Sequence, residues 1–397
     1  MSLSKAKYQP PGIIMIMLIT VTSSSVKMHT GNSYILKRAF LYLICVWFLF
    51  ITDTSAESSG QVDFPSLISS LRIENNVRFC NEDVPLNNRE VRERFEKELL
   101  LSLGDQPQVL LWLKRSSRYL PHIEQTLKIN KMPDDLKYIA IAESALRPHA
   151  GSGKGAMGFW QFLAGTGKKY GLVINRDIDE RRNIFASTEA AVMYLKKLHK
   201  DFKSWTLAAA AYNMGEEGLM AEILEQGTDD YYNLYLPLET QRYIFRILSV
   251  KLILSDPGKY GFKLEDDDYY PPLTFDRVQI NCRQKIPIRI IAQAGNTRFK
   301  VIKDLNPEIR GYYLSKGKHH ILIPRGASNG FKSRYEDCLK KYLSAQKERV
   351  YIVKKGDNLS SIAARYDIPL KNLLIWNHLD INRAIHPGDR LIIHGNK

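Results

Sequence analysis

Glu143 is the residue of this sequence best placed for acid catalysis, because it ends an apolar segment and precedes a glycine-rich loop. From Pro133 to Leu146, apolar residues fall on nearly every side of a helix, so we expect a buried helix that buries Glu143 as well. Burial disfavours the ionised carboxylate and raises its pKa toward neutral pH, where a carboxylic acid can donate a proton. The structural alternative is an inert ion pair with Arg147 one turn later.

The loop after this helix has the composition of a sugar-binding surface. Residues 151–158 are rich in glycine, which lets a backbone approach a ligand closely, and the aromatic–amide pair Trp160-Gln161 follows. The GxxxxGK[ST] spacing of phosphate-binding loops is absent from this loop. Further on, a run of alanines leads into a second pair of this kind, Tyr212-Asn213. Both pairs suit stacking on sugars and hydrogen bonding to them.

Helices must position these residues. Pro133 followed by two aspartates predicts a helix start, because proline fits the first turn and carboxylates complement the helix dipole. Arg147-Pro148 predicts the end of that helix. Helical patterns over residues 89–260 predict a mainly α domain, and we interpret the polar, irregular residues 57–88 as a linker before it.

Beyond the helical domain, strand and helix patterns alternate. They predict small α+β modules at 274–325 and 350–395, separated by a charged linker at 326–349. The two modules match at a constant offset of 71 residues, which predicts a duplication. The matching positions are Ile291-Ala292 with Ile362-Ala363, Phe299 with Leu370, Ile302 with Leu373, and Leu305-Asn306 with Trp376-Asn377.

The N-terminus has the order of a secretory signal. Lys37-Arg38 precede an apolar run at 39–51, and small residues follow at 54–56. We therefore interpret residues 1–56 as a signal sequence, with Met28 as an alternative start and a retained anchor helix as the alternative function. The expected location is the periplasm or cell envelope.

The charge balance is basic: 57 Lys and Arg against 42 Asp and Glu give a net charge of +15, which predicts an acidic partner. Neither a groove-reading motif nor a basic helix accompanies the charge, so we do not expect nucleic acid as that partner.

Three cysteines follow the signal region, Cys80, Cys282 and Cys338. An odd number allows at most one internal disulfide; Cys282 with Cys338 is the favoured pair, and three free thiols are an equal alternative. The cysteine and histidine spacings predict no metal site, and we expect no cofactor.

Six segments together resemble the catalytic domain of the soluble lytic transglycosylases, a goose-lysozyme-like family, and most closely its membrane-bound D group. The segments are Glu143-Ser144, Ser152, 155–161 (Gly-Ala-Met-Gly-Phe-Trp-Gln), 179–182 (Asp-Glu-Arg-Arg), Ala211-Tyr212-Asn213 and 236–243 (Leu-Pro-Leu-Glu-Thr-Gln-Arg-Tyr). They occur in the family's order over about residues 110–255. Phe159 stands where leucine is usual, and residues 214–217 replace the more common Ala-Gly-Pro-Gly.

The resemblance implies a lysozyme-like fold and one catalytic acid. Glu143 would protonate the oxygen that leaves the muramic acid anomeric carbon, and its carboxylate would then take a proton from that sugar's 6-hydroxyl. The hydroxyl closes onto the anomeric carbon and leaves a 1,6-anhydro end. The residues implied to bind substrate are Ser152, Met157, Gln161, Tyr212, Asn213 and Tyr243, the last by supporting Glu143.

The C-terminal module resembles LysM, a βααβ fold that binds N-acetylglucosamine chains. The resemblance rests on residues 351–363 (Tyr-Ile-Val-Lys-Lys-Gly-Asp-Asn-Leu-Ser-Ser-Ile-Ala), 374–377 and 387–391. It implies a glycan groove between two loops, formed by Gly356, Asp357, Asn358, Leu359, Ile381, Asn382 and Ile385. The first copy lacks the Gly-Asp signature and is similar to a degenerate LysM.

Two other functions fit the same sequence. Glycosidases normally use two carboxylates, so a hydrolytic muramidase of this fold could use Asp179, Glu180 or Glu239 as the second, although the resemblance makes Glu180 and Glu239 structural partners of nearby arginines. A non-catalytic wall-binding protein would use only the LysM modules, and the intact Glu143 argues against it. In every case the expected partner is the peptidoglycan glycan strand, with peripheral association with the wall or outer membrane.

Overall fold

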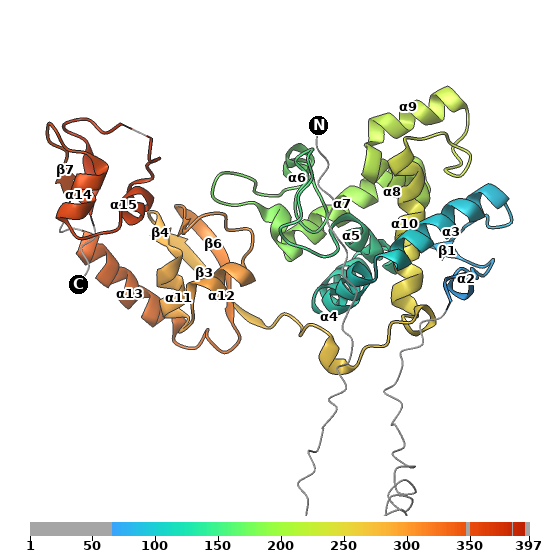
Figure 1. Cartoon of the computed structure of the whole chain (residues 1–397), viewed down its shortest axis with the longest axis horizontal. Coiled ribbons are helices and arrows are strands. Elements are labelled where there is room, and N and C mark those ends of the chain that lie inside the picture. Colours follow the sequence, from blue (N-terminus) through green and yellow to red (C-terminus); the bar gives the residue numbers. More distant parts are fainter. Residues whose placement is uncertain (1–65, 347–349, 383, 394–397) are drawn as a thin grey trace, which may run out of the picture. The chain divides into compact units, whose positions relative to one another are not determined.

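The computed structural model describes residues 66–346, 350–382 and 384–393 (Figure 1). The expected signal sequence lies outside these residues. Within the described ranges, no helix has both the length and the apolar character needed to cross a membrane. The predicted fold class, a mainly α domain followed by small α+β modules, is confirmed.

The helical domain consists of α2 (Leu67–Ser70), β1 (Arg78–Phe79), β2 (Glu82–Asp83), α3 (Arg89–Gly104), α4 (Gln106–Ile129), η1 (Asp134–Leu136), α5 (Lys137–Ser144), α6 (Ala164–Lys169), η2 (Glu180–Arg182), α7 (Ile184–Phe202), α8 (Trp205–Met214), α9 (Glu216–Gln226), α10 (Leu238–Ser255), η3 (Gly258–Tyr260) and η4 (Asp266–Asp268). The first module contains β3 (Phe275–Cys282), β4 (Ile286–Pro287), α11 (Ile288–Ala294), α12 (Phe299–Leu305), β5 (Tyr313–Leu314) and β6 (Gly317–Pro324), and α13 (Phe331–Gln346) follows. The second contains β7 (Val350–Ile352), α14 (Leu359–Arg365), α15 (Leu370–Asn377) and β8 (Arg390–Ile392).

The central helix of the α domain is α10, which packs against α3, α5 and α8. Apolar residues cover several of its faces, and Ile244, Phe245 and Leu248 are completely buried. Phe245 stacks on Phe95 of α3, with 6.0 Å between the ring centroids. Because a buried side chain of this size stabilises the fold by about 1.5–3 kcal/mol, α10 holds these helices together and gives Tyr243 a fixed place in the core.

The helix that carries Glu143 is shorter than predicted. Residues 134–136 form the 3-10 turn η1, and α5 ends at Ser144 rather than Leu146. Ala145 and Leu146 take left-handed conformations with φ of 52° and 56°. Such conformations cost L-residues about 1–2 kcal/mol, and here the complete burial of Leu146 offsets that cost. The chain therefore turns sharply just after Glu143.

The segment interpreted as a linker belongs to the core over residues 73–88, which corrects the prediction. Its hairpin, β1 with β2, places Phe79 in the apolar core of the helices, and Leu86, which follows the hairpin, lies in the same core. Glu82 accepts a hydrogen bond from the Trp205 N–H across 2.5 Å and so caps the N-terminus of α8. A few apolar residues separated by turns produce no periodic pattern, which is why the sequence did not reveal this packing.

The two small modules share one architecture, in agreement with the predicted duplication. Each pairs its first and last strands in antiparallel, and α11 and α14 begin and end 71 residues apart. Asn306, just after α12, donates to the carbonyls of Ile302 and Leu322 and accepts from the Leu322 N–H, at 2.7–2.8 Å. Asn377, at the end of α15, makes the same three bonds in the second module at 2.6–2.9 Å.

Residues 331–346, predicted as part of a linker, form α13. Phe331, Tyr335 and Tyr342 bury their rings in the core of the first module, where α13 packs on α11. In the sequence, charged residues lie between these aromatic residues, so the apolar stripe of the helix was not recognised. The first module therefore includes this helix.

The favoured disulfide between Cys282 and Cys338 is not formed. Both residues are free thiols, as is Cys80. The structure therefore has the three free thiols that the sequence left open. Burial raises the pKa of the Cys282 thiol.

Candidate active site

Glu143 lies in the last turn of α5 and is bonded to α10. The Tyr243 hydroxyl donates to Glu143 Oε1 across 2.5 Å. Tyr243 is completely buried, whereas Glu143 is partly buried and lines a cleft. Because α5 and α10 pack directly on each other, helix packing brings together two residues that are far apart in the sequence.

The environment of Glu143 favours its protonated form. Burial raises the pKa of Glu143 to about 7, and the negative charge of Glu239 acts in the same direction. The hydrogen bond from Tyr243 and the charge of Arg246 lower the pKa, because both stabilise the carboxylate. The balance leaves an acid that is substantially protonated near neutral pH, as the sequence predicted.

The cleft beside Glu143 has a volume of about 630 Å³. It contains four of the six predicted substrate-binding residues, whereas Met157 and Tyr243 do not line it. The lining residues are Glu143, Ser152, Gly153, Lys154, Ala156, Gln161, Phe162, Leu163, Thr166, Tyr194, Tyr212, Asn213, Met214, Gly215 and Glu239.

Gln161 closes the glycine-rich loop and leaves one atom for a ligand. Its Nε2 donates to the carbonyls of Ala150 at 3.0 Å and Gly158 at 2.8 Å. These bonds use both amide hydrogens, so Oε1 remains as an acceptor.

Ser152 and Met157 help to shape the same loop. Ser152 Oγ accepts from the Ala156 N–H across 3.1 Å. The Met157 N–H donates to the Phe162 carbonyl across 3.1 Å, which joins the end of the loop to the segment that follows it. Met157 therefore acts on the cleft through the backbone.

Tyr212 and Asn213 end α8 at the cleft. The Tyr212 hydroxyl donates to the Trp160 carbonyl across 2.6 Å, and burial raises the pKa of Tyr212 well above its ordinary value. Asn213 Oδ1 accepts from the Thr240 hydroxyl across 2.9 Å. What remains is an acceptor on Tyr212 and two donors on Asn213, which suit sugar hydroxyl and N-acetyl groups.

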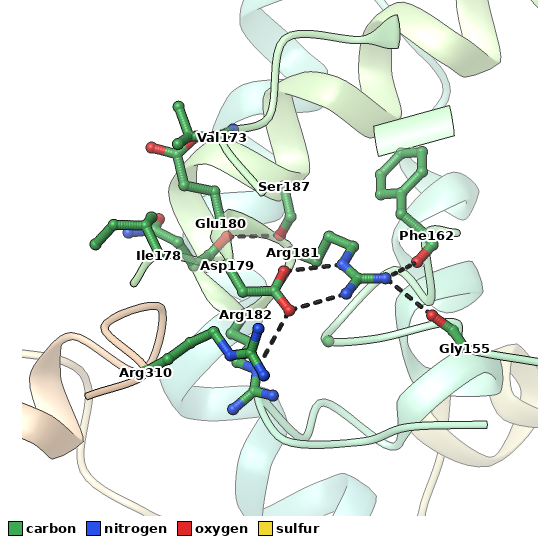
Figure 2. A network of polar contacts seen from close by, with 12 residues as sticks. Gly155, Phe162, Val173, Ile178, Asp179, Glu180, Arg181, Arg182, Ser187 and Arg310 are labelled. Atoms are coloured by element: carbon green, nitrogen blue, oxygen red, sulfur yellow. Dashed lines mark hydrogen bonds and ion pairs between the residues drawn. The ribbon is translucent and has the colours of Figure 1, made fainter. Parts of the chain in front are cut away.

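Arg181 fastens the loop through a network that Figure 2 shows. Its guanidinium donates to the carbonyls of Gly155 at 2.9 Å and Phe162 at 3.0 Å, and it forms two bonds with Asp179 at 2.8 and 2.9 Å. A Cβ at Gly158, whose φ is 81°, would lie 1.8 Å from the Arg181 carbonyl oxygen. Residues 179–182 were recognised in the sequence as part of the family resemblance, but the sequence did not predict that Arg181 holds the loop of the cleft.

The three candidate second carboxylates have different environments. Asp179 is held in its buried ion pair, Glu180 accepts from a backbone N–H, and neither lines the cleft. Glu239 is exposed and does line it. Neither Glu180 nor Glu239 forms an ion pair with an arginine in the described ranges; Arg242 pairs with Glu98, and the charge of Glu239 also acts on Arg242. The described ranges also contain no group of three His, Cys, Asp or Glu residues able to hold a metal ion.

In the C-terminal module, several predicted glycan-binding residues hold the loop itself. Asp357 Oδ2 accepts from the Tyr351 hydroxyl at 2.6 Å and the Lys354 N–H at 2.8 Å. Asn358 caps α14, and Leu359 is buried in the module core. Their side chains are thus engaged before any glycan arrives.

The other predicted glycan-binding residues of this module have side chains that are at least partly exposed to solvent, or they lack a side chain. Ile381 is 64% exposed, Asn382 is exposed and Ile385 packs partly on the core. Gly356 has a φ of 90°, a conformation that favours glycine in the turn before α14.

Comparisons with known families agree with these two regions. Residues 121–235 match the transglycosylase SLT domain, and residues 351–394 match the LysM domain. The crystal structure of the 70 kDa soluble lytic transglycosylase of Escherichia coli shares 18% identity at a TM-score of 0.33, over 44% of this chain and 32% of that one.

Two curated relatives extend the comparison. Membrane-bound lytic murein transglycosylase D of Escherichia coli K12 is 31% identical over 293 residues, which cover 70% of this chain and 64% of the relative. A putative tributyltin chloride resistance protein of Alteromonas sp. strain M-1 is 32% identical over 117 residues, 29% of this chain and 56% of that protein. This chain thus matches the transglycosylase SLT domain and, nearer its C-terminus, the LysM domain, and over 70% of its length it is similar to membrane-bound lytic murein transglycosylase D.

Proposed function

We propose that the protein is a lytic transglycosylase of peptidoglycan. It cleaves the β-1,4 bond between N-acetylmuramic acid and N-acetylglucosamine and leaves 1,6-anhydromuramic ends. The observation that carries the proposal is Glu143, an acid with a pKa of about 7 in a cleft lined by hydroxyl and amide side chains. A pKa near the working pH suits a group that first donates and then accepts a proton.

In this reaction Glu143 serves twice. As an acid it protonates the glycosidic oxygen, so the bond to the muramic anomeric carbon breaks. As a carboxylate, stabilised by the Tyr243 hydroxyl, it takes the proton of the 6-hydroxyl, whose oxygen bonds to the anomeric carbon. An internal nucleophile is favoured because no second molecule has to be captured. Gln161, Tyr212 and Asn213 orient the sugar through the atoms that the loop leaves available.

Mass spectrometry of a wall digest tests the proposal. An anhydro product is lighter than a reducing-end product by one water, so the two chemistries are separated directly. Mainly anhydro ends are expected from the wild-type protein. Mainly reducing ends would reject the transglycosylase and establish a muramidase.

Glu239 supports the muramidase as a second candidate, because it is a carboxylate that lines the cleft and acts electrostatically on Glu143. A muramidase needs such a group to activate water. Glu239→Gln should therefore abolish muramidase activity, whereas a transglycosylase should keep its anhydro products and the rate should change by less than about tenfold.

The LysM domain supports a wall-binding role for the C-terminus, through Gly356 to Leu359 and Ile381 to Ile385. Such a role places the protein outside the cytoplasm, in the periplasm or cell envelope, and the mature chain should begin near Glu57. N-terminal sequencing of the protein extracted from cells tests this, because retention of residues 39–51 would replace secretion with anchoring.

A further inference from the structure

A second cavity, of about 330 Å³, lies next to the catalytic segment and is lined by arginines. We define it as the arginine pocket: Arg115, Arg118, Tyr119, Arg147 and Tyr270. We propose that this pocket binds a free carboxylate of the peptide stems that glycan strands carry. The proposal rests on the proposed function and names a further part of the substrate.

The arginine pocket brings three arginine side chains together. None of its three arginines forms an ion pair with a carboxylate in the part of the chain that the structure describes. Burial, together with the nearby charge of Arg147, lowers the pKa of Arg115 from its ordinary value. Like charges held together in a partly desolvated cavity repel one another, and a bound anion relieves that repulsion.

Each guanidinium is already oriented by the protein. Arg115 Nη1 donates to the Ala145 carbonyl, and Arg147 Nε donates to the Ser144 carbonyl, both at 3.0 Å. Arg118 Nε donates to the Pro271 carbonyl at 3.0 Å. A guanidinium has five N–H groups, so most donors remain for a ligand. Arginine forks match the two oxygens of a carboxylate.

Arg118 and the aromatic rings define one wall of the pocket. The Arg118 guanidinium carbon lies 5.1 Å from the centroid of the Tyr270 ring. Tyr270 is itself tied to α4, because its N–H donates to the Lys114 carbonyl across 3.0 Å. Aromatic stacking and backbone bonds thus restrict the side chain before a ligand binds.

The arginine pocket and the cleft share one loop. Residues 146–150 line the pocket, and the Ala150 carbonyl accepts from Gln161, which lines the cleft. Arg147 follows Glu143 by four residues, so their Cα atoms are at most about 15 Å apart. An extended peptide of about five residues spans roughly 17 Å. A stem attached to the muramic acid at Glu143 is therefore long enough to span this distance, and its free carboxylates are the groups that arginines select.

Cleavage of two matched substrates tests the proposal. Glycan strands with peptide stems are compared with strands from which an amidase has removed them. Arg118→Gln/Arg147→Gln should lower kcat/KM about tenfold or more on the stem-bearing strands and leave the stripped strands unchanged. Equal loss on both substrates, or no loss on either, overturns the proposal.

Two controls keep this result specific. Arg89→Gln/Arg283→Gln makes the same change of charge at exposed positions outside the pocket and should leave both rates unchanged. Arg147→Lys keeps the charge but loses the fork, and it should lose activity only on stem-bearing strands. Thermal unfolding of every variant checks that the fold is kept.

Direct binding separates this proposal from the proposed function. The full chain is titrated with a free stem pentapeptide, with the same peptide after amidation of its carboxyl groups, and with inorganic phosphate. Binding of only the first, lost in Arg118→Gln/Arg147→Gln, supports the proposal even if the wild type cleaves no glycan. Peptide binding that survives amidation or the double substitution overturns it. Phosphate binding without peptide binding overturns it too and assigns the pocket to a phosphate-bearing ligand.

Discussion

Tyr243 donates its hydroxyl hydrogen to Glu143 across 2.5 Å and thereby joins α5 to α10, the central helix of the domain. The bond favours the carboxylate, whereas the surrounding burial favours the acid. The two effects together hold the pKa of Glu143 near the value at which proton donation and acceptance are both easy.

Tyr243→Phe should move the pH profile rather than abolish activity. Without the hydroxyl the pKa of Glu143 rises further, so the alkaline limb of kcat/KM shifts to higher pH by on the order of one unit. Tyr231→Phe is the control, because its buried hydroxyl donates to backbone carbonyls instead. Both variants should lose stability, and only Tyr243→Phe should shift the limb. If the alkaline limb stays at the same pH or moves to lower pH, the hydrogen bond from Tyr243 does not lower the pKa of Glu143.

Glu143→Gln should lower cleavage by about 100- to 10,000-fold, the usual contribution of a general acid or base. The change removes the transferable proton at nearly constant volume, so circular dichroism and binding to intact wall should match those of the wild type. Release of muropeptides at a rate close to the wild type would exclude Glu143 as the acid.

The same substitution should change how stability depends on pH. Glu143 keeps its proton up to about pH 7 in the folded protein, but only to about pH 4 when unfolded. Between these values the folded state binds the extra proton, so wild-type stability falls as the pH rises. Glu143→Gln lacks this loss and should gain on the wild type by on the order of 1–3 kcal/mol between pH 4 and 7. Urea unfolding across that range measures the difference, and a constant difference would contradict the raised pKa.

Much of the site was predictable because it is local in the sequence. Glu143, the glycine-rich loop and the Tyr212-Asn213 pair follow one another in recognisable segments, and the cleft gathers them. The support around them is not local. No pattern shows that the Arg181 side chain meets two loop carbonyls, or that Glu82 caps a helix more than a hundred residues away. Such contacts exist only after the core has packed.

Gly158→Ala tests this support. The new Cβ would overlap the Arg181 carbonyl at a φ of 81°, so we expect a loss of about 3 kcal/mol or more and a large fall in activity. Gly153→Ala is the matched control in the same loop, since no heavy atom lies within 4 Å of its added Cβ. It should unfold within about 1 kcal/mol of the wild type. Equal stability of the two variants in urea would show that the loop can move away from Arg181.

Deleting residues 350–397 should weaken binding to intact wall more than it slows cleavage of short soluble glycans. A tethered module raises the effective concentration of the catalytic domain on an insoluble polymer, whereas a short glycan gives it no second grip. Pelleting with wall and turnover of a soluble oligosaccharide measure the two effects. An equal loss in both would indicate a role of the module in folding.

Asn306 and Asn377 each close their module by holding the last strand to the second helix, independently of the loop before the first helix. A copy can therefore lose its Gly-Asp loop and still fold, because closure and recognition belong to different parts of the chain. The first module keeps the fold without the Gly-Asp loop, so a new loop can be inserted at that position. Transplanting residues 354–358 into it tests whether the first module can carry the loop that is proposed to bind glycan in the second.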